Sequence, residues 1–110
     1  MKFSAQWVQP DGLLIELTAD QLNRESVPEI RRDLFKTVRK KRVHKVVLDL
    51  SRVSRMDTAG VALLVELLDL LDRRNVKLEL SGVNEGNRRM IRLARLDQVF
   101  TISNHAGDET

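Results

Sequence analysis

The chain has 110 residues, a formal net charge of +3 at pH 7 and no cysteine. A chain of this length matches one domain with a modest core. The absence of cysteine excludes a disulfide scaffold, a cysteine-ligated metal and a thiol nucleophile. Hydrophobic residues make up 42% and charged residues 32%, which is typical of a globular protein rather than a disordered one.

The first predicted element is an antiparallel hairpin over residues 3–17. Residues 3–8 alternate weakly, with Phe3, Ala5 and Trp7 on one face, as in a half-buried strand. Residues 9–12, Gln-Pro-Asp-Gly, favour a turn, because proline fixes φ and glycine adopts positive φ. The apolar residues 13–17 predict the second strand, and the polar residues 18–25 predict a loop.

A helix is predicted next, over residues 27–40. Ser26 and Glu29 have the spacing of a capping box, and Pro28 lies in the first turn, where its missing N–H costs nothing. The apolar stripe of this helix comprises Val27, Ile30, Leu34 and Val38. Residues 46–50 then predict a strand buried in the middle of a sheet.

The second half of the chain continues the alternation of strands and helices. Asp57 is an N-cap residue for a helix over 58–73, and residues 76–80 predict a strand that ends at Gly82. Asn84 caps a helix over 85–95, and residues 99–102 predict a short strand or a hydrophobic plug. Residues 104–110 are expected to form a disordered tail behind a single domain over 1–103.

This order of elements predicts an α/β fold. We expect a mixed four- to five-stranded sheet with parallel inner strands, the N-terminal hairpin and three to four helices. The longest apolar run, 61–71, contains Glu66 and Asp69 and is shorter than the roughly 20 residues that span a bilayer. The N-terminal residues contain no apolar signal segment, so we expect a cytoplasmic protein.

The sequence offers no recognisable catalytic or metal-binding constellation. His44 and His105 have no partner at catalytic or ligand spacing. Glu66 and Asp69 share one helical face, as a pair of catalytic carboxylates could. The favoured interpretation is a solvent-exposed face, because Asp69 and Arg73 have the i,i+4 spacing of a surface ion pair. We therefore expect no enzymatic activity, no cofactor and no metal.

Nucleic acid is also not an expected partner. Acidic residues are interspersed with the basic ones, and aromatic residues are only 4% of the chain, too few for a base-stacking surface. Two basic clusters, around residues 36–45 and 88–95, leave nonspecific RNA binding and weak attraction to anionic lipid headgroups as alternatives.

The start of the 58–73 helix is the most informative segment. Ala59 and Gly60 remove side-chain bulk, so that either another part of the chain or a partner approaches this backbone closely. The helix face opposite the leucines is small and weakly charged, which suits a protein contact, although an ordinary solvent-facing surface has the same pattern. The candidate partner-binding residues are Arg52, Ser54, Arg55, Met56, Asp57, Thr58, Ala59, Gly60, Ala62, Val65 and Glu66.

Residues 48–60 carry a family resemblance. The pattern Leu-Asp-Leu-Ser-x-Val-x-x-Met-Asp-Thr-Ala-Gly resembles the signature of STAS domains, named for sulfate transporters and anti-sigma factor antagonists. The resemblance extends over nearly the whole chain, and within the family residues 49–64 are most similar to the STAS subunit of Mla-type phospholipid transporters.

The resemblance implies a partner and a location. A subunit of this type binds the cytosolic ATPase of an ABC transporter that moves phospholipid between the inner and outer membranes. It supports the assembly and activity of the complex, performs no chemistry, and reaches the inner membrane only through its partner. A homodimer or two copies per complex are compatible with this role.

The family also implies an alternative function, that of a phosphorylation-regulated anti-sigma factor antagonist. Those members read Asp-Ser-Ser-Gly, and the second serine receives phosphate from a partner kinase. Here Ala59 occupies that position and has no hydroxyl, so Thr58 is the one residue of the motif open to phosphorylation. A phosphate on Thr58 would lie beside the Asp57 carboxylate and repel it, so we expect Thr58 to be a contact residue.

Overall fold

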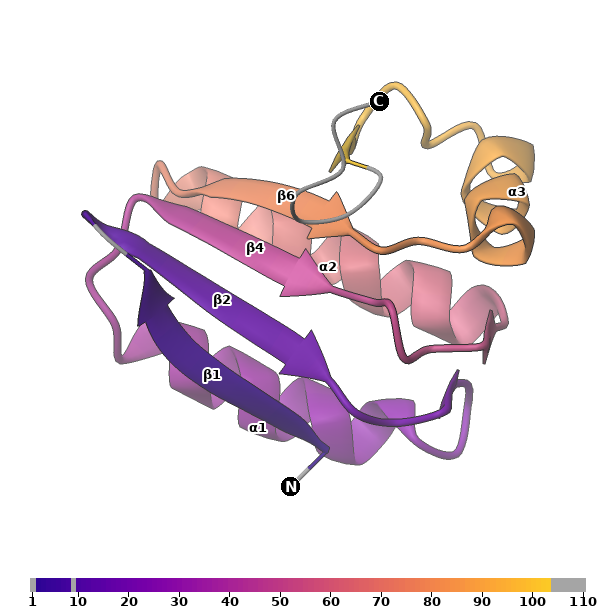
Figure 1. The fold of residues 1–110 in the computed structure, drawn as a ribbon, viewed down its shortest axis with the longest axis horizontal. Coiled ribbons are helices and arrows are strands. Elements are labelled where there is room, and N and C mark those ends of the chain that lie inside the picture. Colours follow the sequence, from indigo (N-terminus) through magenta and orange to yellow (C-terminus); the bar gives the residue numbers. More distant parts are fainter. Residues whose placement is uncertain (1, 9, 104–110) are drawn as a thin grey trace.

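The computed structural model describes residues 2–8 and 10–103 (Figure 1). A five-stranded sheet has the order β1-β2-β4-β6-β7, and α1 and α2 lie behind it in the view of Figure 1. The sheet strands are β1 (Phe3–Val8), β2 (Gly12–Leu17), β4 (Lys45–Asp49), β6 (Lys77–Ser81) and β7 (Thr101–Ile102). The helices are α1 (Val27–Arg39), α2 (Thr58–Arg73) and α3 (Glu85–Leu93), and a separate two-stranded sheet pairs β3 (Gln21–Leu22) with β5 (Arg55–Met56).

The predicted fold class is confirmed. β1 and β2 pair antiparallel, while the β2–β4, β4–β6 and β6–β7 pairs are parallel. Right-handed crossovers through helices are the usual connection between such parallel strands. The expected tail, with His105, lies outside the described residues, as does Gln9 of the predicted turn.

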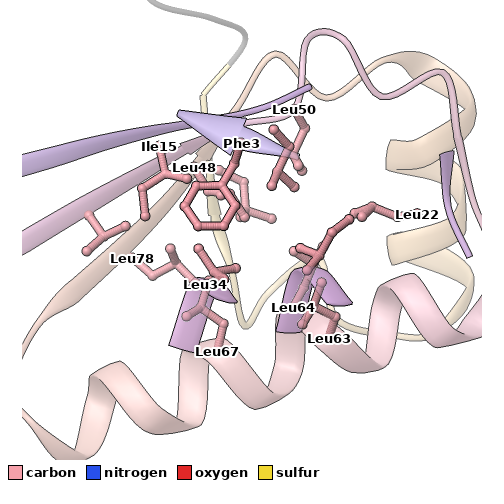
Figure 2. Close-up of a cluster of buried hydrophobic side chains, with 14 of the residues drawn as sticks. Phe3, Ile15, Leu22, Leu34, Leu48, Leu50, Leu63, Leu64, Leu67 and Leu78 are labelled. Carbon is pink, nitrogen blue, oxygen red and sulfur yellow. The ribbon is translucent and has the colours of Figure 1, made fainter. Parts of the chain in front are cut away.

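The core lies between the sheet and the two long helices. Figure 2 shows Ile15, Leu48 and Leu78 of three neighbouring strands facing Leu34 of α1 and Leu67 of α2. Alternate residues of β4 are buried and half-buried, so this strand is covered fully on one face only. The prediction of a strand in the middle of the sheet is confirmed, since β4 lies between β2 and β6.

The edge strand β1 is more exposed than predicted. Phe3 is buried opposite Leu17, but Ala5 is exposed and Trp7 is 57% exposed. Trp7 lies opposite the buried Leu13 and therefore on the same face of the sheet. The helical layer covers that face at Phe3 and does not reach Trp7.

The predicted capping box of α1 is wrong. Ser26 precedes the helix, but its hydroxyl donates to the Gln21 carbonyl at 2.8 Å and accepts from the Asn23 N–H at 3.1 Å. The Asn23 side chain takes over the local role, since its Oδ1 accepts from the N–H groups of Glu25 and Ser26. Asn23 thus takes the Ser26 N–H that the Glu29 side chain would accept in a capping box, and the Ser26 hydroxyl is engaged before the helix begins.

Helix α2 begins and ends where the sequence predicted, while α3 is shorter than predicted. Asp57 caps α2, and the helix runs to Arg73. Helix α3 ends at Leu93 because Arg95 has a positive φ of 62°, a conformation that closes a helix. The predicted final strand is reduced to Thr101–Ile102.

Gly60 brings α2 against the strand β3, which the sequence had predicted to be loop. A Cβ atom on Gly60 would lie 2.6 Å from the Leu22 carbonyl oxygen and 2.9 Å from the Leu22 Cβ. Leu22 itself is fully buried. Of the two explanations for this glycine, the close approach of another part of the chain is the one the structure contains.

We expect Gly60→Ala to destabilise the fold by about 1–2 kcal/mol, because overpacking against backbone outweighs the gain in helix propensity. Gly86→Ala in α3 is the matched control, since its nearest neighbour would lie at 3.6 Å. The control should be neutral or gain up to about 1 kcal/mol. Urea unfolding followed by circular dichroism measures both, and equal stability of the two variants would contradict this packing.

Candidate functional site

The candidate contact residues gather at one end of the molecule. Figure 1 shows this end at the right, where the connections after β2, β4 and β6 lead into α1, α2 and α3. The carboxyl ends of neighbouring parallel strands meet there, which is where αβ folds commonly place functional loops. The loop of residues 50–57, between β4 and α2, lies at its centre.

This loop is held on one side by residues 18–24. The N–H of Ser54 donates to the Asp20 carbonyl at 2.8 Å, and the N–H of Asp57 donates to the Leu22 carbonyl at 3.0 Å. The Ser54 hydroxyl donates to Asp20 Oδ1 at 2.9 Å. Ser54 is exposed, yet its hydroxyl already serves to join two loops of the same chain.

Two asparagines of the α3 end hold the loop on its other side. The buried Asn87 donates from Nδ2 to the Val53 carbonyl at 2.9 Å, and Asn84 donates to the Ser54 carbonyl at 3.0 Å. Asn84 also caps α3 by accepting the Asn87 N–H at 2.7 Å. Asn87 was not predicted as a site residue, although a polar residue one turn before the buried Ile91 in an amphipathic helix indicates a buried hydrogen bond.

At this end of the molecule, which we call the tip, the Asp57 carboxylate accepts hydrogen bonds from three backbone N–H groups. Its Oδ1 accepts from the N–H groups of Ala59 at 2.8 Å and Gly60 at 3.2 Å, and its Oδ2 accepts from the Arg24 N–H at 3.3 Å. Desolvation raises the pKa of this carboxyl, but the hydrogen bonds from Gly60, Arg24 and Ala59 outweigh it. The resulting pKa lies below the ordinary value of 3.8, because all three donors favour the charged form.

Most of the candidate contact residues are accessible. The exposed ones are Arg52, Ser54, Arg55, Thr58, Ala62, Val65 and Glu66, while Asp57 and Ala59 are half-buried. Met56 and Gly60 are buried, so their assignment as contact residues is corrected. Met56 packs in the core, and Gly60 faces Leu22 inside the chain.

The exposed face of α2 carries charges that are partly paired within the chain. Arg31 of α1 donates from Nε to Glu66 Oε1 at 2.6 Å, which the sequence did not predict. The predicted pair of Asp69 and Arg73 is present at 3.0 Å.

The loop arginines differ from these paired residues. Within residues 2–8 and 10–103, neither Arg52 nor Arg55 makes an ion pair. Beside Arg55, a hollow of about 240 Å³ is lined by Gln21, Asn23, Arg55, Met56 and Asp57. The guanidinium groups at the tip are therefore available to carboxylates from outside the chain.

His44 is not part of this end of the molecule. His44, at the opposite end of the sheet, has Nδ1 at 2.9 Å from Asp11 Oδ2, a pairing that sequence spacing did not reveal. In the part of the chain that the structure describes, no three acidic or histidine side chains form a group able to hold a metal ion. No described helix has the length and apolar character to cross a bilayer.

The arrangement defines a class of protein: an α/β domain with an antiparallel first hairpin, parallel inner strands and a loop-and-helix tip. The solved structures that share this fold include two anti-sigma factor antagonist-type proteins. The unphosphorylated anti-sigma factor antagonist SpoIIAA has a TM-score of 0.76 at 19% identity, over 94% of this chain and 90% of that chain. An anti-sigma-factor antagonist (STAS) domain protein from Planctomyces limnophilus has a TM-score of 0.80 at 16% identity, over 94% and 89%.

Sequence comparison identifies the family. The model of the STAS domain matches residues 5–109. The chain is 36% identical over 86 residues to the intermembrane phospholipid transport system binding protein MlaB of Escherichia coli (strain K12), covering 77% of this chain and 81% of that protein. The same values hold for MlaB of Shigella flexneri. The chain belongs to the STAS domain family, which confirms the resemblance of residues 48–60.

The lowered pKa of Asp57 predicts a pH-dependent contribution to stability. A carboxyl whose pKa is lower in the folded chain stabilises it fully above the unfolded value, 3.8 here, and loses this effect as pH falls through the folded pKa. Asp57→Asn keeps a capping side chain but removes the charge. Urea unfolding should show the wild type more stable than Asp57→Asn at pH 7 and a smaller difference at pH 2.5. A difference equal at both pH values would contradict this account.

Proposed function

We propose that this chain is a non-catalytic subunit of an ABC-type intermembrane phospholipid transporter and binds its cytosolic ATPase. The contact is the α2 tip surface, which we define as Arg52, Arg55, Thr58, Ala62, Val65 and Glu66. The observation that carries the proposal is this exposed surface on a loop held from both sides, in a chain 36% identical to MlaB. The protein would act in the cytoplasm and meet the inner membrane through that partner.

The shape of the α2 tip surface supports a protein contact. Thr58 and Ala62 lie one turn apart on α2 and have short side chains, so a partner can approach the helix closely. Val65 follows on the same exposed side and is 38% exposed. A small apolar centre with a charged rim is the usual anatomy of a protein interface.

The charges around this centre indicate what the partner supplies. Arg52 and Arg55 extend from the loop, and Glu66 is already paired with Arg31. Arginine forms bidentate bonds with carboxylates, so acidic side chains on the ATPase would match the loop end of the surface. The backbone hydrogen bonds of residues 50–57 limit the entropy lost when these groups are ordered.

Thr58→Glu should weaken binding to the ATPase subunit about tenfold or more, because it places an unpaired charge at the centre of the contact. The fold should persist, since an acidic residue in the first turn of a helix is favourable. Affinity can be measured by isothermal titration calorimetry with the purified transporter ATPase from the same organism. Thr101→Glu, on the exposed edge strand β7, is a control with the same change in charge.

Normal affinity of Thr58→Glu would place the contact elsewhere on the chain. The anti-sigma factor antagonist alternative has its own readout, because Thr58 is exposed at the first position of α2. Intact-mass measurement after incubation with cell lysate and ATP should show no stoichiometric phosphate. Phosphate on Thr58 together with no ATPase binding would favour the alternative.

A further inference from the structure

Three parts of the chain build the end of the molecule opposite the α2 tip surface: Val8 with residues 10–12, residues 39–45, and residues 72–77. Figure 1 shows this end at the left, where β2, β4 and β6 begin. His44 connects the segments, since its N–H donates to the Asp11 carbonyl and its carbonyl accepts the Lys77 N–H, both at 2.9 Å. Arg74 donates from Nη2 to the Arg39 carbonyl at 3.1 Å. We call these segments the basic pole.

The basic pole concentrates the positive charge of the chain. Residues 39–45 contain five cations, residues 72–77 contain three cations and one carboxylate, and residues 8–12 contain only the Asp11 carboxylate, so the pole carries +6 with histidine neutral. The whole chain carries +3. The remainder of the chain therefore carries a net charge of −3, so the positive charge is concentrated at this end.

Most of these cations are not neutralised within the chain. The Asp11 carboxylate lies 2.9 Å from His44 Nδ1, and the Lys45 ammonium pairs with Glu79 Oε1 at 2.9 Å. The cations that make no ion pair with a described carboxylate are Arg39, Lys40, Lys41, Arg42, Arg74 and Lys77. An open hollow of about 520 Å³ lies among them, lined by Lys41, Arg42, Val43, His44, Arg74, Asn75 and Val76.

An exposed tryptophan borders the same cations. The Lys41 ammonium lies 5.4 Å from the centre of the Trp7 ring, and Trp7 is 57% exposed. Val8, at the end of β1, is 44% exposed. Tryptophan is the side chain most characteristic of the boundary between lipid headgroups and acyl chains, and cations attract the anionic headgroups around it.

We propose that the basic pole is a docking surface for a bilayer containing anionic phospholipids, with Trp7 inserted at the headgroup level. Charge complementarity carries this assignment: six cations of the pole make no ion pair with a described carboxylate, three of them (Lys41, Arg42 and Arg74) line the hollow, and an exposed tryptophan ring lies beside Lys41. The surface lies opposite the α2 tip surface, so one molecule can use both at once. The proposal does not depend on the ATPase contact.

The composition of the pole favours a lipid surface over RNA. Protein surfaces that bind single-stranded RNA without sequence preference stack successive bases on several aromatic side chains. The pole presents one aromatic ring, at its margin. A flat anionic surface needs only charge and one or two amphipathic anchors.

The test uses the 110-residue chain, whose single tryptophan is Trp7. Vesicles of phosphatidylcholine with about one third phosphatidylglycerol should sediment the protein and shift its tryptophan emission to shorter wavelength, and pure phosphatidylcholine vesicles should do neither. Neutralising Lys40, Lys41 and Arg42 together to glutamine should weaken vesicle binding about tenfold or more. The control neutralises Lys2, Arg32 and Arg89 to glutamine, giving the same net charge away from the pole.

The outcomes separate the proposal from its rivals. Equal loss of binding in both triple variants, or binding with no change in Trp7 emission, would overturn it, because net charge alone would then explain the attraction. Tighter binding to single-stranded RNA than to these vesicles, with RNA displacing the protein from them, would also overturn it. Thr58→Glu should bind vesicles normally, so failure of the ATPase contact and failure of this proposal give different results.

Discussion

The packing of Leu22 against Gly60 is the contact on which the tip depends. Leu22 is fully buried, and its carbonyl accepts the N–H of Asp57, the residue that caps α2. A side chain on Gly60 would occupy the space that Leu22 fills. This close approach between two segments far apart in sequence positions the start of α2 and its cap, and the hydrogen bonds with Asp20, Asn84 and Asn87 then hold residues 50–57.

The elements that sequence predicted well are those whose signals are local. The helix over 58–73 follows from one capping carboxylate and a leucine pattern, and both lie within the segment itself. The capping box of Ser26 and Glu29 failed because the Asn23 side chain accepts the Ser26 N–H that Glu29 would accept. A short-range pattern does not rank two polar residues that satisfy the same backbone groups.

The hydrogen bonds and ion pairs that hold the tip could not be predicted from the sequence, for a different reason. Asn87 lies 34 residues from the Val53 carbonyl to which it donates, and Arg31 lies 35 residues from Glu66. Only the tertiary fold brings such pairs together. The exposed candidate contact residues on α2 were predictable because helix periodicity separates the polar face of α2 from its leucines. The burial of Met56 and Gly60 was not, because it depends on β3, a segment that the sequence predicted to be a loop.

The tip is assembled from three stretches that are synthesised at different times. Residues 18–24 and 50–57 leave the ribosome before Asn84 and Asn87, which complete the hydrogen bonds of the loop. A nascent chain lacking α3 has the α2 residues but leaves one side of the loop unsupported. The partner contact proposed for the α2 tip surface would therefore require a completed domain, and an unfinished chain would compete poorly for it.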